Sequence, residues 1–173
     1  HVLHSPQLKL ALLPASPALA GAEVELVNML ARETRLRAAL ATLESGYDYL
    51  LVDCPPSLGL LTINGLVAAR DGVIIPVQCE YLALEGLSML LNTVRQVREI
   101  LNDRLVVAGV LLTMYDSRTL HGKEVLTTLV EGWGDLVFHT VIRRTVKFSD
   151  STVAGEPITE YAPTSPGADS YRQ

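Results

Sequence analysis

Hydrophobic positions along the 173 residues follow two spacings. Short apolar runs, which are typical of buried strands, occupy residues 8–13, 49–52, 73–77, 106–114 and 137–142. Apolar residues that recur every three or four positions predict helices over residues 21–43, 58–69, 82–101 and 122–129. The first of these helices is either continuous or broken near Thr34, and Gly46 marks its end.

The alternation of strands and helices predicts an α/β fold with a mostly parallel sheet flanked by helices. We expect the 173 residues to form a single domain. The run at residues 106–114 is apolar at consecutive positions, which indicates a strand covered by helices on both faces. After residue 149, frequent Pro, Gly, Ser and Thr predict an irregular chain with short helical turns. Ligands bind at the carboxyl ends of parallel strands, so the residues after each run are the first candidates for a site.

Asp53 ends one of the apolar runs, within YDYLLVDCPPSLGLL at residues 47–61. Pro55 and Pro56 follow it and have no N–H group, so the strand stops there. A carboxylate at the rim of a sheet needs a cation or hydrogen-bond donors, and magnesium is a common partner. From the pattern alone, a magnesium ligand and a simple turn residue both remain open for Asp53.

Charge is distributed unevenly along this acidic chain, whose net charge is -5. This balance excludes a protein that binds nucleic acid over its whole surface. Residues 117–148 reverse the balance locally with Arg118, Lys123, Arg143, Arg144 and Lys147. This segment is either a solvated rim or a surface for phosphate backbones, and without an aromatic ladder it suits duplex DNA better than single strands. No apolar stretch reaches the length of a membrane span and no membrane anchor is visible, so we expect a cytoplasmic protein.

Four long motifs resemble the ParA/Soj family of chromosome- and plasmid-partitioning ATPases. YDYLLVDCPPSLGLLTINGL at residues 47–66 is similar to the Walker B and switch II segment of that family. The resemblance continues through LPASPALAGAEVELV at residues 13–27, PVQCEYLALEGLSMLLNTVR at residues 76–95 and GVLLTMYDSRT at residues 109–119. It implies a P-loop NTPase fold of the deviant Walker type.

The resemblance also implies a function. Members form a dimer around ATP and Mg²⁺, bind double-stranded DNA non-specifically at the nucleoid, and are stimulated by a ParB-like partner. On matching positions, Asp53 is the catalytic Walker B acid, which acts on magnesium directly or through water. The resemblance assigns further residues to the nucleotide (Pro55, Pro56, Asp116 and Arg143) and to DNA (Arg118, Arg144 and Lys147).

The chain departs from the family at several places, two of which concern the nucleotide. The glycine-rich loop that ends in Gly-Lys-Thr is absent, and the only Gly-Lys pair, Gly122 and Lys123, is followed by Glu124. We therefore expect these residues to be the C-terminal part of a ParA-type ATPase domain whose P-loop unit lies outside them, and to hydrolyse no ATP alone. Arg143 stands where the family usually has proline, which alters the predicted base pocket.

Two other functions remain open. A MinD-like ATPase that positions the division machinery shares much of the implied fold. A ParA-like interaction module that binds partners without nucleotide is the alternative from a non-enzymatic class.

Overall fold

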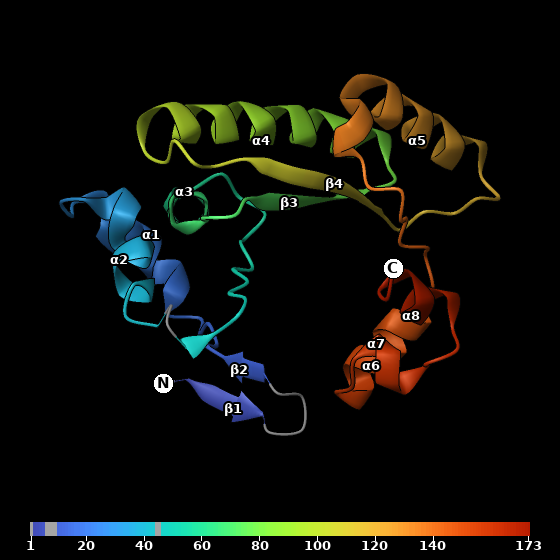
Figure 1. The fold of residues 1–173 in the computed structure, drawn as a ribbon, viewed down its shortest axis with the longest axis horizontal. Helices are drawn as coiled ribbons and strands as arrows, with labels where there is room; N and C mark the ends of the chain where they lie inside the picture. The colour runs from blue at the N-terminus through green and yellow to red at the C-terminus, as the bar shows by residue number, and fades with distance from the viewer. Residues whose placement is uncertain (1, 6–9, 44–45) are drawn as a thin grey trace. The chain divides into compact units, whose positions relative to one another are not determined.

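The computed structural model describes residues 2–5, 10–43 and 46–173. The chain divides into two compact units, His1–Ala68 and Ala69–Gln173, which we describe separately. Their elements are labelled in Figure 1. The single domain expected over residues 1–173 stays a prediction.

The first unit begins with a short hairpin. Strand β1 (Leu3–Ser5) pairs antiparallel with β2 (Leu10–Leu12), so that Leu3 lies opposite Leu12. Strand β2 confirms the predicted run over residues 10–12, whereas positions 8 and 9 lie outside the described residues. The antiparallel partner β1 was not predicted.

Helical segments make up most of the rest of this unit: α1 (Leu19–Val27), the 3-10 helix η1 (Arg32–Thr34), α2 (Arg35–Leu40) and α3 (Leu60–Ala68). The helix predicted over residues 21–43 is thus broken, and the break comes ahead of Thr34. Ala31 adopts a left-handed conformation with φ of 54°, which an α-helix cannot contain. Helix α2 ends at Leu40, before Gly46.

A buried asparagine joins α3 to α2. The amide oxygen of Asn64 accepts a hydrogen bond from the backbone N–H of Leu36 at 3.0 Å. Its amide nitrogen donates to the carbonyl of Arg32 at 2.8 Å and to that of Leu60 at 2.9 Å. The side chain thereby satisfies its amide while closing the N-terminal end of α2.

Residues 49–52 do not form the predicted strand. They are irregular, and Tyr49 and Leu51 are 88% and 91% exposed. An apolar run becomes a strand only when a neighbouring strand bonds its backbone groups, and no strand pairs with this run in the described part of the chain. The prediction was wrong because the sequence pattern shows that residues 49–52 are hydrophobic but not whether another strand pairs with them.

The second unit is built on two parallel strands. Strands β3 (Val73–Gln78) and β4 (Val107–Thr113) pair in parallel, with Ile75 opposite Val110 and a register shift between Val73 and Ile74. Helix α4 (Tyr81–Ile100) connects the two strands. Helix α5 (Leu120–Trp133) and the 3-10 helix η3 (Gly134–Leu136) follow β4. The predicted parallel sheet and its helices are confirmed here.

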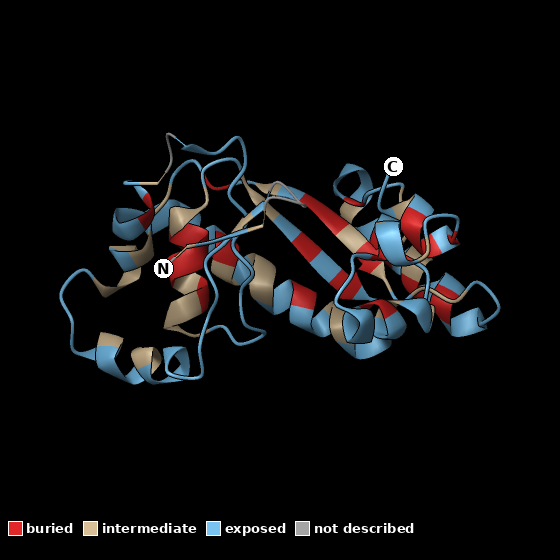
Figure 2. Ribbon diagram, turned by 90° about the horizontal axis from the view of Figure 1, so that it is seen from below, coloured by how far each residue is buried: buried red, intermediate tan, exposed pale blue. Residues whose placement is uncertain are grey.

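Helices α4 and α5 pack on one face of this sheet (Figure 1). The core between them contains Ile75, Val77, Leu87, Val110, Leu112, Val125 and Leu129. Figure 2 shows the buried positions as alternating bands along β3 and β4, as expected when successive strand residues point to opposite faces.

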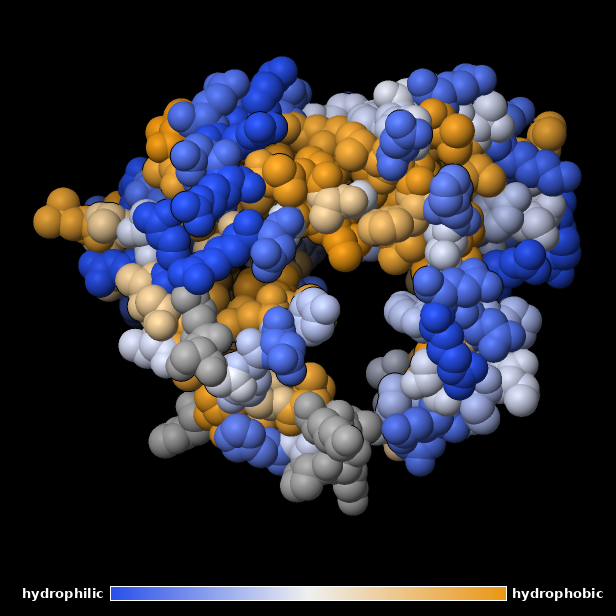
Figure 3. Space-filling view, in the orientation of Figure 1, coloured by the Kyte–Doolittle hydropathy of each residue, from blue (hydrophilic) through white to orange (hydrophobic). Residues whose placement is uncertain are grey.

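The other face of the sheet contradicts the expectation of helices on both sides. Ile74 of β3 is 55% exposed, and Val106 just ahead of β4 is 43% exposed. Figure 3 shows hydrophobic side chains at the surface along this part of the molecule. The apolar run at residues 106–114 predicted a strand buried on both faces, whereas the described helices of this unit cover only one face of the sheet.

Residues 137–142 touch the sheet without forming the predicted strand. Val137 bridges to Val110, and the N–H groups of Phe138 and Ile142 donate to Val110 and Leu112 at 2.9 Å each. The chain therefore advances four residues, from Phe138 to Ile142, while β4 advances only two, from Val110 to Leu112. The excess chain bulges outward and prevents a continuous ladder.

Three short helices end the chain: α6 (Lys147–Ala154), α7 (Ile158–Tyr161) and α8 (Pro166–Ser170). This region is more helical than predicted, although two of the helices are single turns. The hydroxyl of Ser165 accepts from Ala168 N–H at 3.2 Å and caps α8. Among the described residues, no helix combines the length and the apolar composition that a bilayer span requires.

Candidate functional site

The carboxyl ends of β3 and β4 bring three loops together. Cys79 N–H donates to Thr113 at 2.9 Å, and its thiol donates to the carbonyl of Gly122 at 3.3 Å. Met114 follows β4 with φ of 56°, a left-handed conformation that is strained for a residue with a side chain. The turn at Met114 directs Tyr115 and Asp116 away from the line of the strand.

Tyr115, which follows β4, pairs with the segment that contains Arg143 and Arg144. Its N–H donates to Ile142 at 3.1 Å, and its carbonyl accepts from Arg144 N–H at 3.0 Å. Tyr115 and Arg143 therefore form a parallel bridge. The bridge places Tyr115 beside Arg143, although the strand predicted over residues 137–142 was wrong.

Asp116 and Arg118 form a bidentate ion pair. Arg118 Nε donates to Asp116 Oδ1 at 2.9 Å, and Arg118 Nη2 donates to Oδ2 at 2.7 Å. The backbone N–H of Arg118 also donates to Oδ1 at 3.0 Å. The two side chains are 25% and 87% exposed, so the carboxylate lies beneath an arginine that faces solvent.

These contacts shift the pKa values of both Asp116 and Arg118. Hydrogen bonds from Arg118 hold the pKa of Asp116 well below its usual range, and the charge of Arg144 adds a smaller effect in the same direction. The same hydrogen bond raises the pKa of Arg118. Asp116 thus stays ionised, paired with Arg118 and within the electrostatic influence of Arg144.

Thr119 fixes the loop to α5. Its hydroxyl accepts from Gly122 N–H at 3.1 Å and donates to the carbonyl of Asp116 at 3.0 Å. Sequence reasoning missed this cap, although a threonine just before a helix is a known N-cap signal. Gly122 is required here because a Cβ at this position would lie 2.8 Å from the carbonyl oxygen of Asp116.

Four exposed basic residues, which we call the basic group, surround this edge or follow it: Arg118, Arg143, Arg144 and Lys147. Lys147 is the first residue of α6. Arg118 is paired with Asp116, and the described residues contain no ion pair of the other three.

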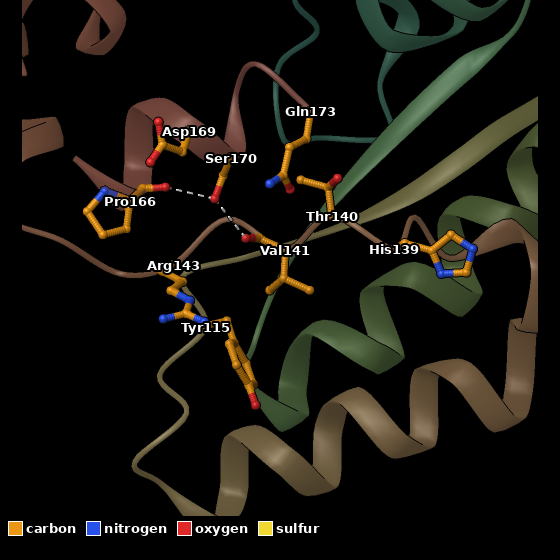
Figure 4. A pocket seen from close by; sticks show the side chains of 9 residues that line it. All are labelled: Tyr115, His139, Thr140, Val141, Arg143, Pro166, Asp169, Ser170 and Gln173. Atoms are coloured by element: carbon orange, nitrogen blue, oxygen red, sulfur yellow. Dashed lines mark hydrogen bonds between the residues drawn. The ribbon is translucent and has the colours of Figure 1, made fainter. Parts of the chain in front are cut away.

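A hollow of about 460 Å³ lies beside Arg143 (Figure 4). Its walls are Tyr115, His139, Thr140, Val141, Arg143, Pro166, Asp169, Ser170 and Gln173. Ser170 Oγ donates to Val141 at 3.3 Å and to Pro166 at 3.0 Å, which ties α8 to the opposite wall. Sequence reasoning named Arg143 and missed the walls, because α8 falls in the segment expected to be irregular.

Asp53, Pro55 and Pro56 belong to the first unit and lie in an irregular, exposed segment. The hydroxyl of Thr62 in α3 donates to the carbonyl of Ser57 and, at 3.3 Å, to that of Pro55, which anchors the loop. The described residues contain no group of three or more His, Cys, Asp and Glu side chains placed to hold a metal. Asp53 offers a single solvent-facing carboxylate, a ligand type that fits Mg²⁺ when waters or phosphates supply the rest.

Cys54 lies between Asp53 and the prolines. Its sulfur rests against Gly65 of α3, where a Cβ would come within 2.5 Å of it. Burial, and next the charge of Asp53, raise the pKa of this thiol. Cys79 is buried, whereas Cys54 is exposed.

Comparison with known proteins places these motifs in a family. The sequence model of a family described as AAA domain matches residues 1–107. Sporulation initiation inhibitor protein Soj of Bacillus subtilis is 54% identical over 159 residues, which cover 92% of this chain and 62% of Soj. Chromosome-partitioning ATPase Soj of Thermus thermophilus is 50% identical over 162 residues, covering 94% and 63% of the two chains. The chain belongs to the AAA domain family, in its ParA/Soj branch.

A solved structure shares the fold of this chain. It is described as cobyrinic acid a,c-diamide synthase from Mycobacterium smegmatis with bound ADP and magnesium, and it is 40% identical. The TM-score is 0.80, and the match covers 99% of this chain and 62% of that chain. The fold is therefore the α/β fold of this family. The chain spans between half and two thirds of the length of the curated relatives it matches.

Proposed function

We propose that this ParA/Soj-family chain serves ATP-dependent DNA partitioning. The observation that carries the proposal is the 50% identity to the chromosome-partitioning ATPase Soj of Thermus thermophilus over 94% of the chain. The identity to the structure named for diamide synthesis is lower, at 40%. Partitioning is therefore the better supported of the two activities.

Each unit has its own candidate residues for contact with a nucleotide. Asp53 would hold Mg²⁺, directly or through water, and Pro55 and Pro56 end the segment that presents it. Bound Mg²⁺ would neutralise the charge of the phosphates. Arg143, which lines the hollow, and Asp116, which follows the lining residue Tyr115 in sequence, are the candidates for contact with the nucleotide base.

DNA binding would use three members of the basic group: Arg118, Arg144 and Lys147. Its members are exposed on a chain of net charge -5, so they concentrate positive charge locally on an acidic protein. Contact with phosphates is independent of sequence, which suits non-specific binding of duplex DNA. An ATP-bound homodimer, a ParB-like partner and a place at the nucleoid in the cytoplasm complete the proposal.

Binding to duplex DNA of mixed sequence, measured in the natural protein that contains this sequence, tests the proposal. Reversing the charge in the double variant Arg144→Glu and Lys147→Glu should weaken binding at least tenfold and reduce the slope of log affinity against log salt by roughly two. Arg98→Glu, an exposed arginine on α4 outside the basic group, provides the matched control and should change little. Unchanged affinity and slope in the double variant would contradict the DNA surface.

ATP provides the second arm of this test. Binding should be stronger with ATP and Mg²⁺ than with ADP, and Asp53→Ala should remove the difference while leaving the protein folded. Equal DNA binding with ATP, with ADP and without nucleotide would favour an interaction module instead.

A further inference from the structure

We propose that Asp116 is a positioning residue, which holds the Arg118 guanidinium by one edge so that the other edge faces a DNA phosphate. The inference rests on the proposed DNA binding and assigns to Asp116 a role beyond the one predicted from sequence. The orientation of the ion pair matters, because a carboxylate can either leave the outer edge of an arginine free for a ligand or block it.

The pair uses one edge of the guanidinium. Arg118 Nε and Nη2 donate to the two carboxylate oxygens of Asp116. Nη1 has no hydrogen-bond partner in the described part of the chain, and the side chain is 87% exposed. The outer edge, formed by Nη1 and the second N–H of Nη2, therefore keeps the planar fork that binds phosphate through two parallel hydrogen bonds.

Asp116 can orient Arg118 because it is itself fixed. Its carbonyl accepts from the hydroxyl and the N–H of Thr119, at 3.0 and 3.2 Å. Its Oδ1 also accepts the backbone N–H of Arg118. The carboxylate is thus anchored to the first turn of α5, and the arginine is attached to a rigid element.

Two effects of the carboxylate oppose each other. Its negative charge weakens the attraction of the basic group for phosphate. Against this, an arginine held in one conformation loses less side-chain entropy on binding. Asp116 also lowers the repulsion between Arg118 and Arg144, whose charges both act on it. The free outer edge favours positioning, and the sign of the effect of Asp116→Ala decides between the two.

A double-mutant cycle in the natural protein, with a mixed-sequence DNA duplex, tests the role. Asp116→Ala should weaken binding roughly threefold or more although it removes a negative charge, and Arg118→Ala should weaken it at least as much. The double variant should match Arg118→Ala, because Asp116 acts through Arg118. Arg118→Lys keeps the positive charge but lacks the planar guanidinium fork. In that variant, adding Asp116→Ala should leave DNA affinity unchanged. Asp135→Ala, an exposed acid in η3, controls for charge and should leave binding equal or slightly stronger.

The inference would be overturned, and the proposed function would stand, if Asp116→Ala bound DNA more tightly. The same holds if Asp116→Ala changed DNA affinity equally in the presence and absence of Arg118. No DNA binding by the unsubstituted protein would overturn both. Proton exchange at Arg118 Nε, followed by NMR without DNA, provides an independent readout. Exchange should accelerate in Asp116→Asn and Asp116→Ala, and an unchanged rate would show that the ion pair does not hold the arginine.

Discussion

Asn64 accepts a hydrogen bond from the backbone N–H of Leu36 at 3.0 Å, across 28 positions of sequence. The Asn64 side chain is 3% exposed and also bonds the carbonyl of Arg32. Replacing it leaves two backbone groups of the η1 and α2 junction without their partner. We expect Asn64→Ala to lower the free energy of unfolding by about 1–3 kcal/mol in urea denaturation.

The matched control is Asn92→Ala. Asn92 is exposed on α4, and its hydrogen bond with Arg95 is on the surface. This change should lie within about 0.5 kcal/mol of the unsubstituted chain. Equal losses at the two positions would show that Asn64 does not hold α2.

Two glycines of α5 should respond oppositely to the same substitution. Gly122→Ala places a Cβ 2.8 Å from the backbone oxygen of Asp116, so it should destabilise the chain by about 1–3 kcal/mol. Gly132 has no atom within 4 Å of an added Cβ, so Gly132→Ala should stabilise it by about 0.5–1 kcal/mol. Thermal unfolding of both variants measures the difference, and stabilisation by both would contradict the close approach at Gly122.

The pH dependence of Asp116 follows from its ion pair. The pKa of Asp116 is lowered in the folded state, so the stability that the pair contributes is present above the ordinary aspartate pKa of about 3.9. It is lost as the pH falls through the lowered value. Carboxyl ¹³C shifts from NMR should show Asp116 still ionised when ordinary aspartates are protonated. Arg118→Ala should raise the pKa toward its usual range, and an unchanged titration would exclude Arg118 as the cause.

ATP hydrolysis by the 173 residues alone should be absent. The Gly122 and Lys123 pair lies inside α5, with Glu124 next, and a helix interior cannot present its N–H groups to phosphates as a loop does. Phosphate release with ATP and Mg²⁺ should equal that of an Asp53→Ala variant purified in the same way. Release that exceeds the variant would contradict this expectation.

The sequence allowed prediction of the elements that local pattern determines. Helix α4 has Leu87, Val94 and Val97 buried on one stripe, and this spacing is visible in the sequence before any tertiary contact is known. Residues 49–52 and 137–142 carry equally apolar runs, yet neither is a strand. Strand formation depends on a backbone partner distant in sequence, which hydrophobicity does not show.

The candidate site was predictable to a similar degree. The rule that ligands bind beyond parallel strands drew attention to the residues after each apolar run. Beyond β4, Asp116 pairs with Arg118, and Arg143 bridges to Tyr115. The bidentate contact of Asp116 was not predictable, because residues two apart face each other only in particular turns. Their roles toward nucleotide and DNA stay predictions.

The thiol of Cys79 lies where the turn after β3 meets the first turn of α5. It is 7% exposed, and burial together with Glu80 raises its pKa, which slows reaction with labelling reagents. A reagent can reach the sulfur only when the bond to Gly122 breaks and the two turns separate. The labelling rate would therefore report the population of locally open forms, and it would equal the opening rate only where labelling outpaces reclosing. Cys79 thus lets the opening of this edge of the sheet be followed through a residue that the chain already contains.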